Sequence, residues 1–159
     1  MAGAPVTVQG LMTRNVITIG PGAEVAQAVE LLHRHHISGM PVVDAHHEVV
    51  GVVSEVDIIA RRGRLVSDIM SAEPRTIDED ASLSEAAAIL FQERIRRLPV
   101  VRHGKLVGLV ARTDLVNFFA RREWVCTGCG TTERGLEPPA ACANCGAATF
   151  EQEDAPHGM

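Results

Sequence analysis

Apolar and polar residues alternate along the first third of the chain in a way that predicts short strands and helices. Val25, Val29 and Leu32 recur at helical spacing, which predicts a helix with one apolar face. Two valine-rich runs then flank a polar turn, a pattern typical of a strand–turn–strand unit. The elements expected, in order, are a strand at 15–19, a helix at 23–35, strands at 41–43 and 49–53, and a helix at 57–62.

The same succession of elements is present a second time, further along the chain. Two groups of matching segments keep one offset of 58 positions, and a third matches after a one-residue deletion. A long unit that is present only twice predicts a pseudo-twofold pair rather than a solenoid. The matching segments are Leu11-Met12-Thr13 with Ile69-Met70-Ser71, Met40-Pro41-Val42-Val43 with Leu98-Pro99-Val100-Val101, and Gly51 to Asp57 with Gly108 to Asp114.

Each repeat is expected to form a βαββα unit, so the predicted fold class is α+β. In the second repeat, Ser82 and Glu85 have the spacing of a capping box at the start of a helix. Neither small sheet can bury its apolar face alone, which favours packing of the two repeats against each other. The predicted domains are repeat 1 at 8–64, repeat 2 at 65–122, a small metal-bound β ribbon at 123–151 and a flexible polar tail at 152–159.

Composition and charge narrow the function classes. Hydrophobic residues make up 46% of the 159 positions, but no apolar run approaches the ~20 residues of a membrane span, and no export signal is recognisable. We therefore expect a cytoplasmic protein without a membrane partner. The net charge is −5, and residues 122–159 alone carry −4, with two arginines against six acidic residues. Nucleic-acid binding normally needs a basic face, so no nucleic-acid partner is expected.

The repeated segments resemble the CBS domain family, and two in tandem are similar to a Bateman module. The resemblance covers roughly residues 8–121 and lies in the openings, the two hydrophobic-Pro-Val-Val strands and the two segments that run from Gly to Asp. It implies binding of an adenine nucleotide such as AMP or ATP, or of a related adenosine compound, in clefts between the repeats. It also implies a homodimer and a regulatory action on an unidentified protein partner rather than an enzymatic activity.

The resemblance further assigns residues to two clefts. In each cleft an Asp binds ribose hydroxyls and a preceding Ser or Thr helps to hold phosphate, while the other repeat contributes its opening strand and the residues before its proline. The first cleft is expected to combine Ser54 and Asp57 with Ser71, Ile95, Arg96 and Arg97. The second is expected to combine Thr113 and Asp114 with Thr13, Ile17, Ile37, Ser38 and Gly39.

The two clefts are expected to differ in affinity. The Asp57 cleft has the Ser54 hydroxyl and gains two arginines, whose planar guanidinium groups suit phosphate oxygens. The Asp114 cleft has Ala111 in place of that serine, although Thr113 could substitute for it. We therefore expect the Asp57 cleft to be the stronger nucleotide site and the Asp114 cleft to be weak, empty or suited to a less charged adenosine compound.

All four cysteines lie near the C-terminus, as Cys126-x-x-Cys129-Gly and Cys142-x-x-Cys145-Gly. Four thiolates in two such pairs form a tetrahedral metal site, whereas two disulfides are unexpected without an export signal. The segment resembles both zinc ribbons and the rubredoxin-like domain that ends rubrerythrins, so the ligands suit zinc or iron. Few aromatic residues surround the site and no second redox centre is recognisable, which favours one structural zinc per chain.

The sequence therefore predicts a regulatory ligand-sensing module with a metal ribbon that serves stability or partner docking. One alternative is a redox protein, in which iron in the four-cysteine site is modulated by the CBS pair. A second alternative is a nucleic-acid regulator that reads its target with the ribbon, against which the negative charge of that segment argues. The colour and redox response of the purified protein would distinguish the first alternative from the zinc hypothesis.

Overall fold

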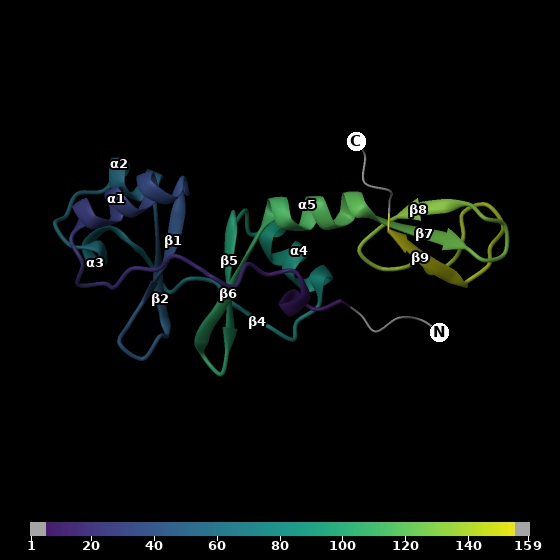
Figure 1. Cartoon of the computed structure of the whole chain (residues 1–159), viewed down its shortest axis with the longest axis horizontal. Coiled ribbons are helices and arrows are strands. Elements are labelled where there is room, and N and C mark those ends of the chain that lie inside the picture. The colour runs from purple at the N-terminus through teal and green to yellow at the C-terminus, as the bar shows by residue number, and fades with distance from the viewer. Residues whose placement is uncertain (1–5, 155–159) are drawn as a thin grey trace. The chain divides into compact units, whose positions relative to one another are not determined.

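The computed structural model describes residues 6–154 of the chain (Figure 1). The described residues divide into two compact units that do not coincide with the two sequence repeats. What we call the first unit contains residues 13–79 and 98–109, and the second unit contains residues up to 12, 80–97 and those from 110 onward. Each unit is described by itself below.

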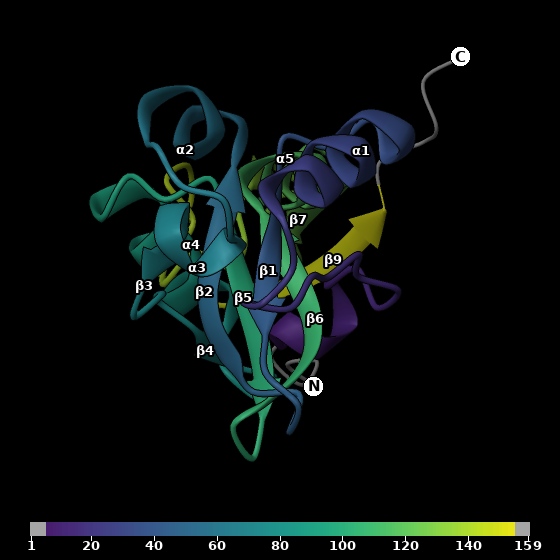
Figure 2. The same cartoon turned by 90° about the vertical axis from the view of Figure 1, so that its left-hand side faces the viewer.

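The first unit is built on a three-stranded antiparallel sheet in the order β1-β2-β3. Strands β1 (Gly39–Val43) and β2 (Val49–Ser54) lie side by side as a hairpin (Figure 2). The short strand β3 (Ser71–Ala72) pairs with β2, with Ser71 opposite Val52. This pairing needs a glycine at position 51, because a β-carbon there would lie 2.6 Å from the sulfur of Met70.

Helices cover the core of the first unit. Helix α1 (Val25–His35) ends at His36, which has a left-handed backbone conformation, and α2 (Glu55–Ala60) follows β2 without a loop. The short helix α3 (Val66–Ile69) then leads into β3. Aliphatic side chains from these elements form the buried core: Ile19, Ala28, Leu32, Met40, Val42, Val53, Val66 and Ile69.

A second three-stranded sheet has the order β4-β5-β6. Strand β4 (Ile77–Asp78) runs parallel to β5 (Arg97–Arg102), with Ile77 opposite Val100. Strand β6 (Lys105–Ala111) follows β5 after a tight turn in which His103 and Gly104 have positive φ angles of 51° and 78°. The turn that the sequence placed between these strands is thus short and sharp.

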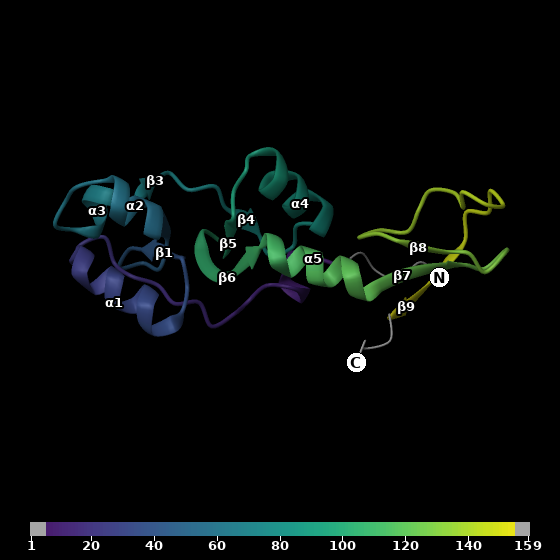
Figure 3. The same ribbon diagram turned by 90° about the horizontal axis from the view of Figure 1, so that it is seen from above.

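The second unit contains two helices and the C-terminal ribbon. A 3₁₀ helix (Val8–Gly10) precedes α4 (Leu83–Gln92), and α5 (Arg112–Arg121) continues directly into strand β7 (Arg122–Cys126), as Figure 3 shows. Strands β8 (Thr132–Arg134) and β9 (Phe150–Asp154) pair with β7 in the antiparallel order β8-β7-β9. The Trp124 indole is 9% exposed and donates a hydrogen bond to the carbonyl oxygen of Gly135 at 2.9 Å.

The α+β class is confirmed, and the second repeat has all five elements of the predicted βαββα unit. The predicted strand at 15–19 is wrong, because this segment contributes only an isolated bridge between Ile19 and Val42. The predicted tail at 152–159 is also corrected, since residues 152–154 pair with β7 within β9. Residues 155–159 of that tail lie outside the described residues, and the packing of the two repeats on each other stays a prediction.

No helix in the described part of the chain combines the length and the apolar character needed to cross a membrane.

Candidate functional sites

The Asp57 carboxylate is held at the start of α2 by a reciprocal pair of hydrogen bonds. The Ser54 hydroxyl accepts from the Asp57 backbone amide at 3.4 Å, while Asp57 Oδ2 accepts from the Ser54 amide at 2.9 Å and from its hydroxyl at 3.0 Å. Such a capping box fixes both the helix start and the carboxylate rotamer. Asp57 is only 8% exposed. Its second oxygen, Oδ1, remains for another partner and lies 3.8 Å from Arg61 Nε.

Several residues that the sequence placed in the two clefts lie around this helix start in the first unit. Gly39 pairs with Ser54 across the hairpin, and the Ser38 carbonyl accepts a hydrogen bond from the Glu55 amide at 3.0 Å. Ser71 pairs with Val52, two residues before Ser54. A polar hollow of about 320 Å³ opens beside them and is lined by Leu32, His33, His36, Ile37, Ser38 and Glu55.

The equivalent helix start in the second unit is built more simply. Asp114 occupies the same third position of α5, and its Oδ2 accepts a hydrogen bond from the Ala111 amide at 2.8 Å. Because residue 111 is alanine, no hydroxyl returns the hydrogen bond that Ser54 makes in α2. Thr113, which the sequence offered as a substitute, is exposed at the second position of the helix.

Arg112 anchors the segment before the second proline to α5. Its guanidinium donates to the carbonyl oxygens of Ile95 at 3.0 Å and of Leu90 at 3.1 Å, and it lies over the Phe91 ring at 5.6 Å. The Arg112 amide also reaches the Arg96 carbonyl at 3.4 Å. Two of the residues predicted for the first cleft, Ile95 and Arg96, are therefore fixed through their backbone within the second unit.

Each predicted cleft takes residues from both units. In the first cleft Ser54, Asp57 and Ser71 belong to the first unit, and in the second cleft Asp114 and Thr113 belong to the second unit. Thr13 pairs with Leu109 in the first unit, where Ile17 and Ile37 also pack against the core. The assembly of either complete cleft stays a prediction. The residues contributed across units are Ile95, Arg96 and Arg97 for the first cleft, and Thr13, Ile17, Ile37, Ser38 and Gly39 for the second.

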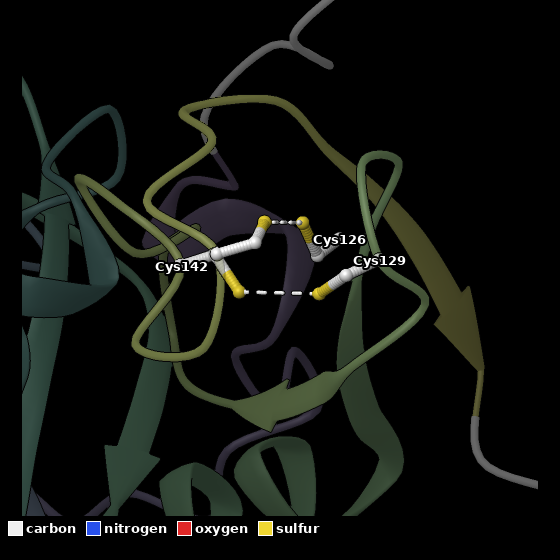
Figure 4. A group of neighbouring side chains, drawn as sticks. Cys126, Cys129 and Cys142 are labelled. Atoms are coloured by element: carbon white, nitrogen blue, oxygen red, sulfur yellow. Dashed lines mark hydrogen bonds between the residues drawn. The ribbon is translucent and has the colours of Figure 1, made fainter.

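The four cysteines converge at the end of the ribbon, as predicted. Figure 4 shows Cys126, Cys129 and Cys142 turned toward a common centre. All four sulfurs, with that of Cys145, lie within 4.8 Å of one another, and the pairs 126–145 and 129–142 are each 3.6 Å apart. Sulfurs joined in a disulfide would be ~2.05 Å apart, whereas the edges of a tetrahedron with metal–sulfur bonds of 2.3 Å are roughly 3.8 Å long. The spacing fits a tetrahedral metal site.

The backbone around the cysteines supports the same interpretation. The amides of Gly130 and Gly146 donate to the carbonyls of Cys126 and Cys142 at 2.8 and 2.9 Å, which closes two equivalent tight turns. Both glycines have positive φ angles, of 76° and 77°, a conformation that L side chains rarely adopt. The glycine after each pair is thus required by the turn that brings two sulfurs to one side.

The thiols influence one another's protonation strongly. The Thr131 hydroxyl lies 3.1 Å from Cys129 Sγ and, together with Asn144, lowers the pKa of Cys129 to about 6. The Ala147 amide favours the thiolate of Cys145, but the three neighbouring sulfurs outweigh it and raise the pKa of Cys145 to about 12. Four thiols packed this closely cannot all lose their protons without a cation to compensate the charge.

The ribbon is attached to the helices of the second unit at a second place besides the α5–β7 junction. The Ser84 hydroxyl donates to the Glu137 carboxylate at 2.8 Å. One residue earlier, Leu136 lies over an apolar hollow of about 190 Å³ that is otherwise lined by Ala87, Phe91, Leu115, Val116 and Phe119. The segment between the two cysteine pairs therefore contacts both α4 and α5.

Comparison with known families matches the CBS domain at residues 8–63 and again at residues 66–121, which together make up more than half of the chain. The chain belongs to the CBS domain family. The ribbon, with its four cysteines, lies beyond the matched residues. The CBS domain-containing protein YhcV of Bacillus subtilis is 34% identical over 116 residues, which cover 69% of this chain and 82% of that protein.

Other relatives carry CBS domains within longer proteins. The inosine-5'-monophosphate dehydrogenase of Korarchaeum cryptofilum is 37% identical over 118 residues. The chain spans 25% of the length of that enzyme and 62% of the length of the CBSX1 protein of Arabidopsis thaliana. The shared part is thus the CBS pair.

Two solved structures of CBS pairs were determined with adenosine compounds. CBSX2 in complex with AMP is 34% identical, with a TM-score of 0.68 over 70% of this chain and 94% of that one. The CBS pair of protein MJ0100, in complex with 5'-methylthioadenosine and S-adenosyl-L-methionine, is 26% identical, with a TM-score of 0.68 over 74% of this chain and 98% of that one. Homologous CBS pairs therefore bind adenosine ligands that differ in charge.

Sequence reasoning missed two arginines of this CBS pair. Arg112 was not considered because its anchoring contacts are to backbone carbonyls, which no side-chain pattern reveals. Arg61 was seen only as the end of a helix, although it faces the Asp57 carboxylate. Its position four residues after Asp57, on the same face of the helix, was the available signal.

Proposed function

We propose that this chain is a regulatory module that binds an adenine nucleotide or a related adenosine compound through Asp57 and Asp114, without an enzymatic activity of its own. The observation that carries the proposal is the matched placement of the two aspartates, each at the third position of the helix that closes its repeat. In both helices one carboxylate oxygen is held by the backbone, which leaves the other for a ribose hydroxyl. The adenosine ligands of CBSX2 and MJ0100 support the ligand class.

Calorimetric titration of the full chain tests this proposal. AMP, ATP, NADH and S-adenosylmethionine are titrated separately, with guanosine monophosphate as a control for the base. We expect saturable binding of at least one adenosine compound and no comparable heat from the guanine nucleotide. Absence of binding by all four adenosine compounds would contradict the proposal.

We further propose that the four cysteines hold one metal ion, with zinc favoured over iron. Cys126 and Cys142 are buried, Cys129 and Cys145 are exposed, and the sulfur spacing suits either metal. A bound divalent ion would compensate the thiolate charges and, as in other small ribbons, contribute folding free energy. The ribbon would then serve stability or the docking of a protein partner.

Metal analysis of protein purified from its native host tests the metal assignment. We expect about one zinc per chain and a colourless protein. Stoichiometric iron with a red colour that bleaches reversibly on reduction would contradict the zinc assignment and favour the redox alternative.

Finally, we propose that the protein acts as a cytoplasmic homodimer. Large apolar side chains are exposed on α4 and α5, where Phe91, Val116 and Phe119 are 52%, 57% and 43% exposed. Light scattering coupled to size exclusion should give twice the mass of one chain. Phe119→Asp should shift that mass toward the monomer, whereas a monomeric wild-type protein would contradict the proposal.

A further inference from the structure

Arg61 joins two segments of the proposed Asp57 site that the sequence did not connect. Its Nη1 donates to the Met70 carbonyl at 3.1 Å and approaches the Ile69 carbonyl at 3.4 Å, immediately before Ser71. Its Nε lies 3.8 Å from Asp57 Oδ1, the oxygen that the capping box leaves available. The guanidinium therefore spans the space between the carboxylate and the opening of the next repeat.

The remaining nitrogen of this guanidinium is available to a ligand. Among the described residues, Arg61 Nη2 makes no hydrogen bond or ion pair, and the side chain is 51% exposed. An arginine in this situation presents N–H donors and a permanent positive charge that match a phosphate group. The carbonyls of Ile69 and Met70 hold it in place but do not neutralise it.

The second repeat differs at the equivalent position. Asp57 corresponds to Asp114, so Arg61 corresponds to Phe118, an aromatic residue without charge. The Phe118 ring is occupied by the Arg122 guanidinium, which lies 4.1 Å from its centroid. The helix that carries Asp114 thus has no cation four residues after its aspartate.

We propose that Arg61 is a specificity-determining residue of the Asp57 site, which favours adenine nucleotides with a phosphate over uncharged adenosine. The inference rests on the proposed nucleotide-binding function and extends it to the charge of the ligand. Asp57 reads the ribose, a group that nucleotides and nucleosides share, so it contributes to the affinity for both. Arg61 contributes only when the ligand carries negative charge, and Phe118 makes no such contribution at the Asp114 site.

The test compares AMP with adenosine by calorimetry in metal-loaded, full-length Asp114→Ala protein, which isolates the Asp57 site. Arg61→Ala should weaken AMP binding about tenfold or more, in line with the loss of a charge-assisted hydrogen bond, while adenosine binding changes less than about twofold. Arg61→Lys keeps the charge and should lose less AMP affinity. Arg62→Ala, which removes the neighbouring exposed arginine, should change neither ligand.

A complementary variant tests the same idea by gain of function. In Asp57→Ala protein, Phe118→Arg should increase the preference of the Asp114 site for AMP over adenosine. Equal weakening of AMP and adenosine by Arg61→Ala would overturn the proposal, because it would show that Arg61 only supports the backbone. If Asp114→Ala protein with intact Arg61 binds neither ligand, the nucleotide-binding function itself fails, a result visible before any change at Arg61.

Discussion

Helices α2 and α5 arise from the same repeated segment but are finished differently. Helix α2 begins with a complete capping box, has six residues and ends at Arg61, whose guanidinium turns back toward Asp57. Helix α5 begins at Ala111 with one of the two capping hydrogen bonds, has ten residues and continues into the ribbon strand β7. Duplication has preserved the aspartate while its surroundings have diverged.

The difference suggests a division of labour between the two repeats. The first repeat concentrates polar and charged groups around its aspartate, which suits a charged ligand. The second repeat connects its aspartate-bearing helix directly to the four-cysteine ribbon and supports that connection with the Ser84–Glu137 hydrogen bond. One helix is thus specialised for ligand binding, and the other links a candidate ligand site to the metal site.

Metal removal should produce the largest effect and should separate the two helices. Chelation, or Cys126→Ser, should unfold residues 123–151, because structural metal binding contributes on the order of 10 kcal/mol to small ribbons that lack a core of their own. Helix α2 and the first unit should persist. Amide signals followed by nuclear magnetic resonance during chelation would show this, and simultaneous loss of the signals of both units would contradict it.

A substitution at Gly51 should produce the next largest effect, confined to the first unit. In Gly51→Ala the added β-carbon would lie 2.6 Å from Met70 Sδ and 3.0 Å from the Ser71 carbonyl oxygen. Overpacking of this kind costs about 1–3 kcal/mol of unfolding free energy. Gly22→Ala is the matched control, because nothing lies within 4 Å of its new β-carbon. Denaturant unfolding should therefore distinguish the two variants, and equal stabilities would refute the close approach of β3 to β2.

The helix caps should produce a smaller and reciprocal effect. Ser54→Ala removes the cap of α2 and should lower the unfolding free energy by about 1 kcal/mol. Ala111→Ser adds a hydroxyl at the equivalent position and should stabilise α5 by a similar or smaller amount. Thermal unfolding of the two single variants measures both changes. A stabilising Ser54→Ala would show that the capping box does not support α2.

The fold could be predicted largely from the sequence because duplication supplied two views of each element. The helices and hairpin strands follow apolar periodicity, and the four cysteines follow a spacing that only a common centre explains. The strand predicted at 15–19 failed because β propensity does not reveal whether a partner strand is in register. Strand β9 was missed because residues 150–154 have only Phe150 as an apolar signal, and their pairing with β7 depends on the turns around the cysteines.

The candidate site could be predicted only in part. Asp57, Asp114 and the serine cap were visible because they recur or have a known spacing. Arg61 and Arg112 were not, because their partners are backbone carbonyls distant in sequence, such as those of Met70 and Ile95. Residues that a chain brings together through its backbone leave no periodic trace in the sequence.

The most direct test of the difference between the two helices is AMP binding measured by calorimetry on three proteins. We expect Asp57→Ala to weaken AMP binding about tenfold or more, since hydrogen bonds to a charged group contribute ~1.5–3 kcal/mol. Asp114→Ala should weaken it less, because its helix start lacks both the serine hydroxyl and the arginine. The contrary result, in which Asp57→Ala binds AMP as tightly as the wild-type protein and Asp114→Ala does not, would contradict the assignment of the stronger nucleotide site to α2.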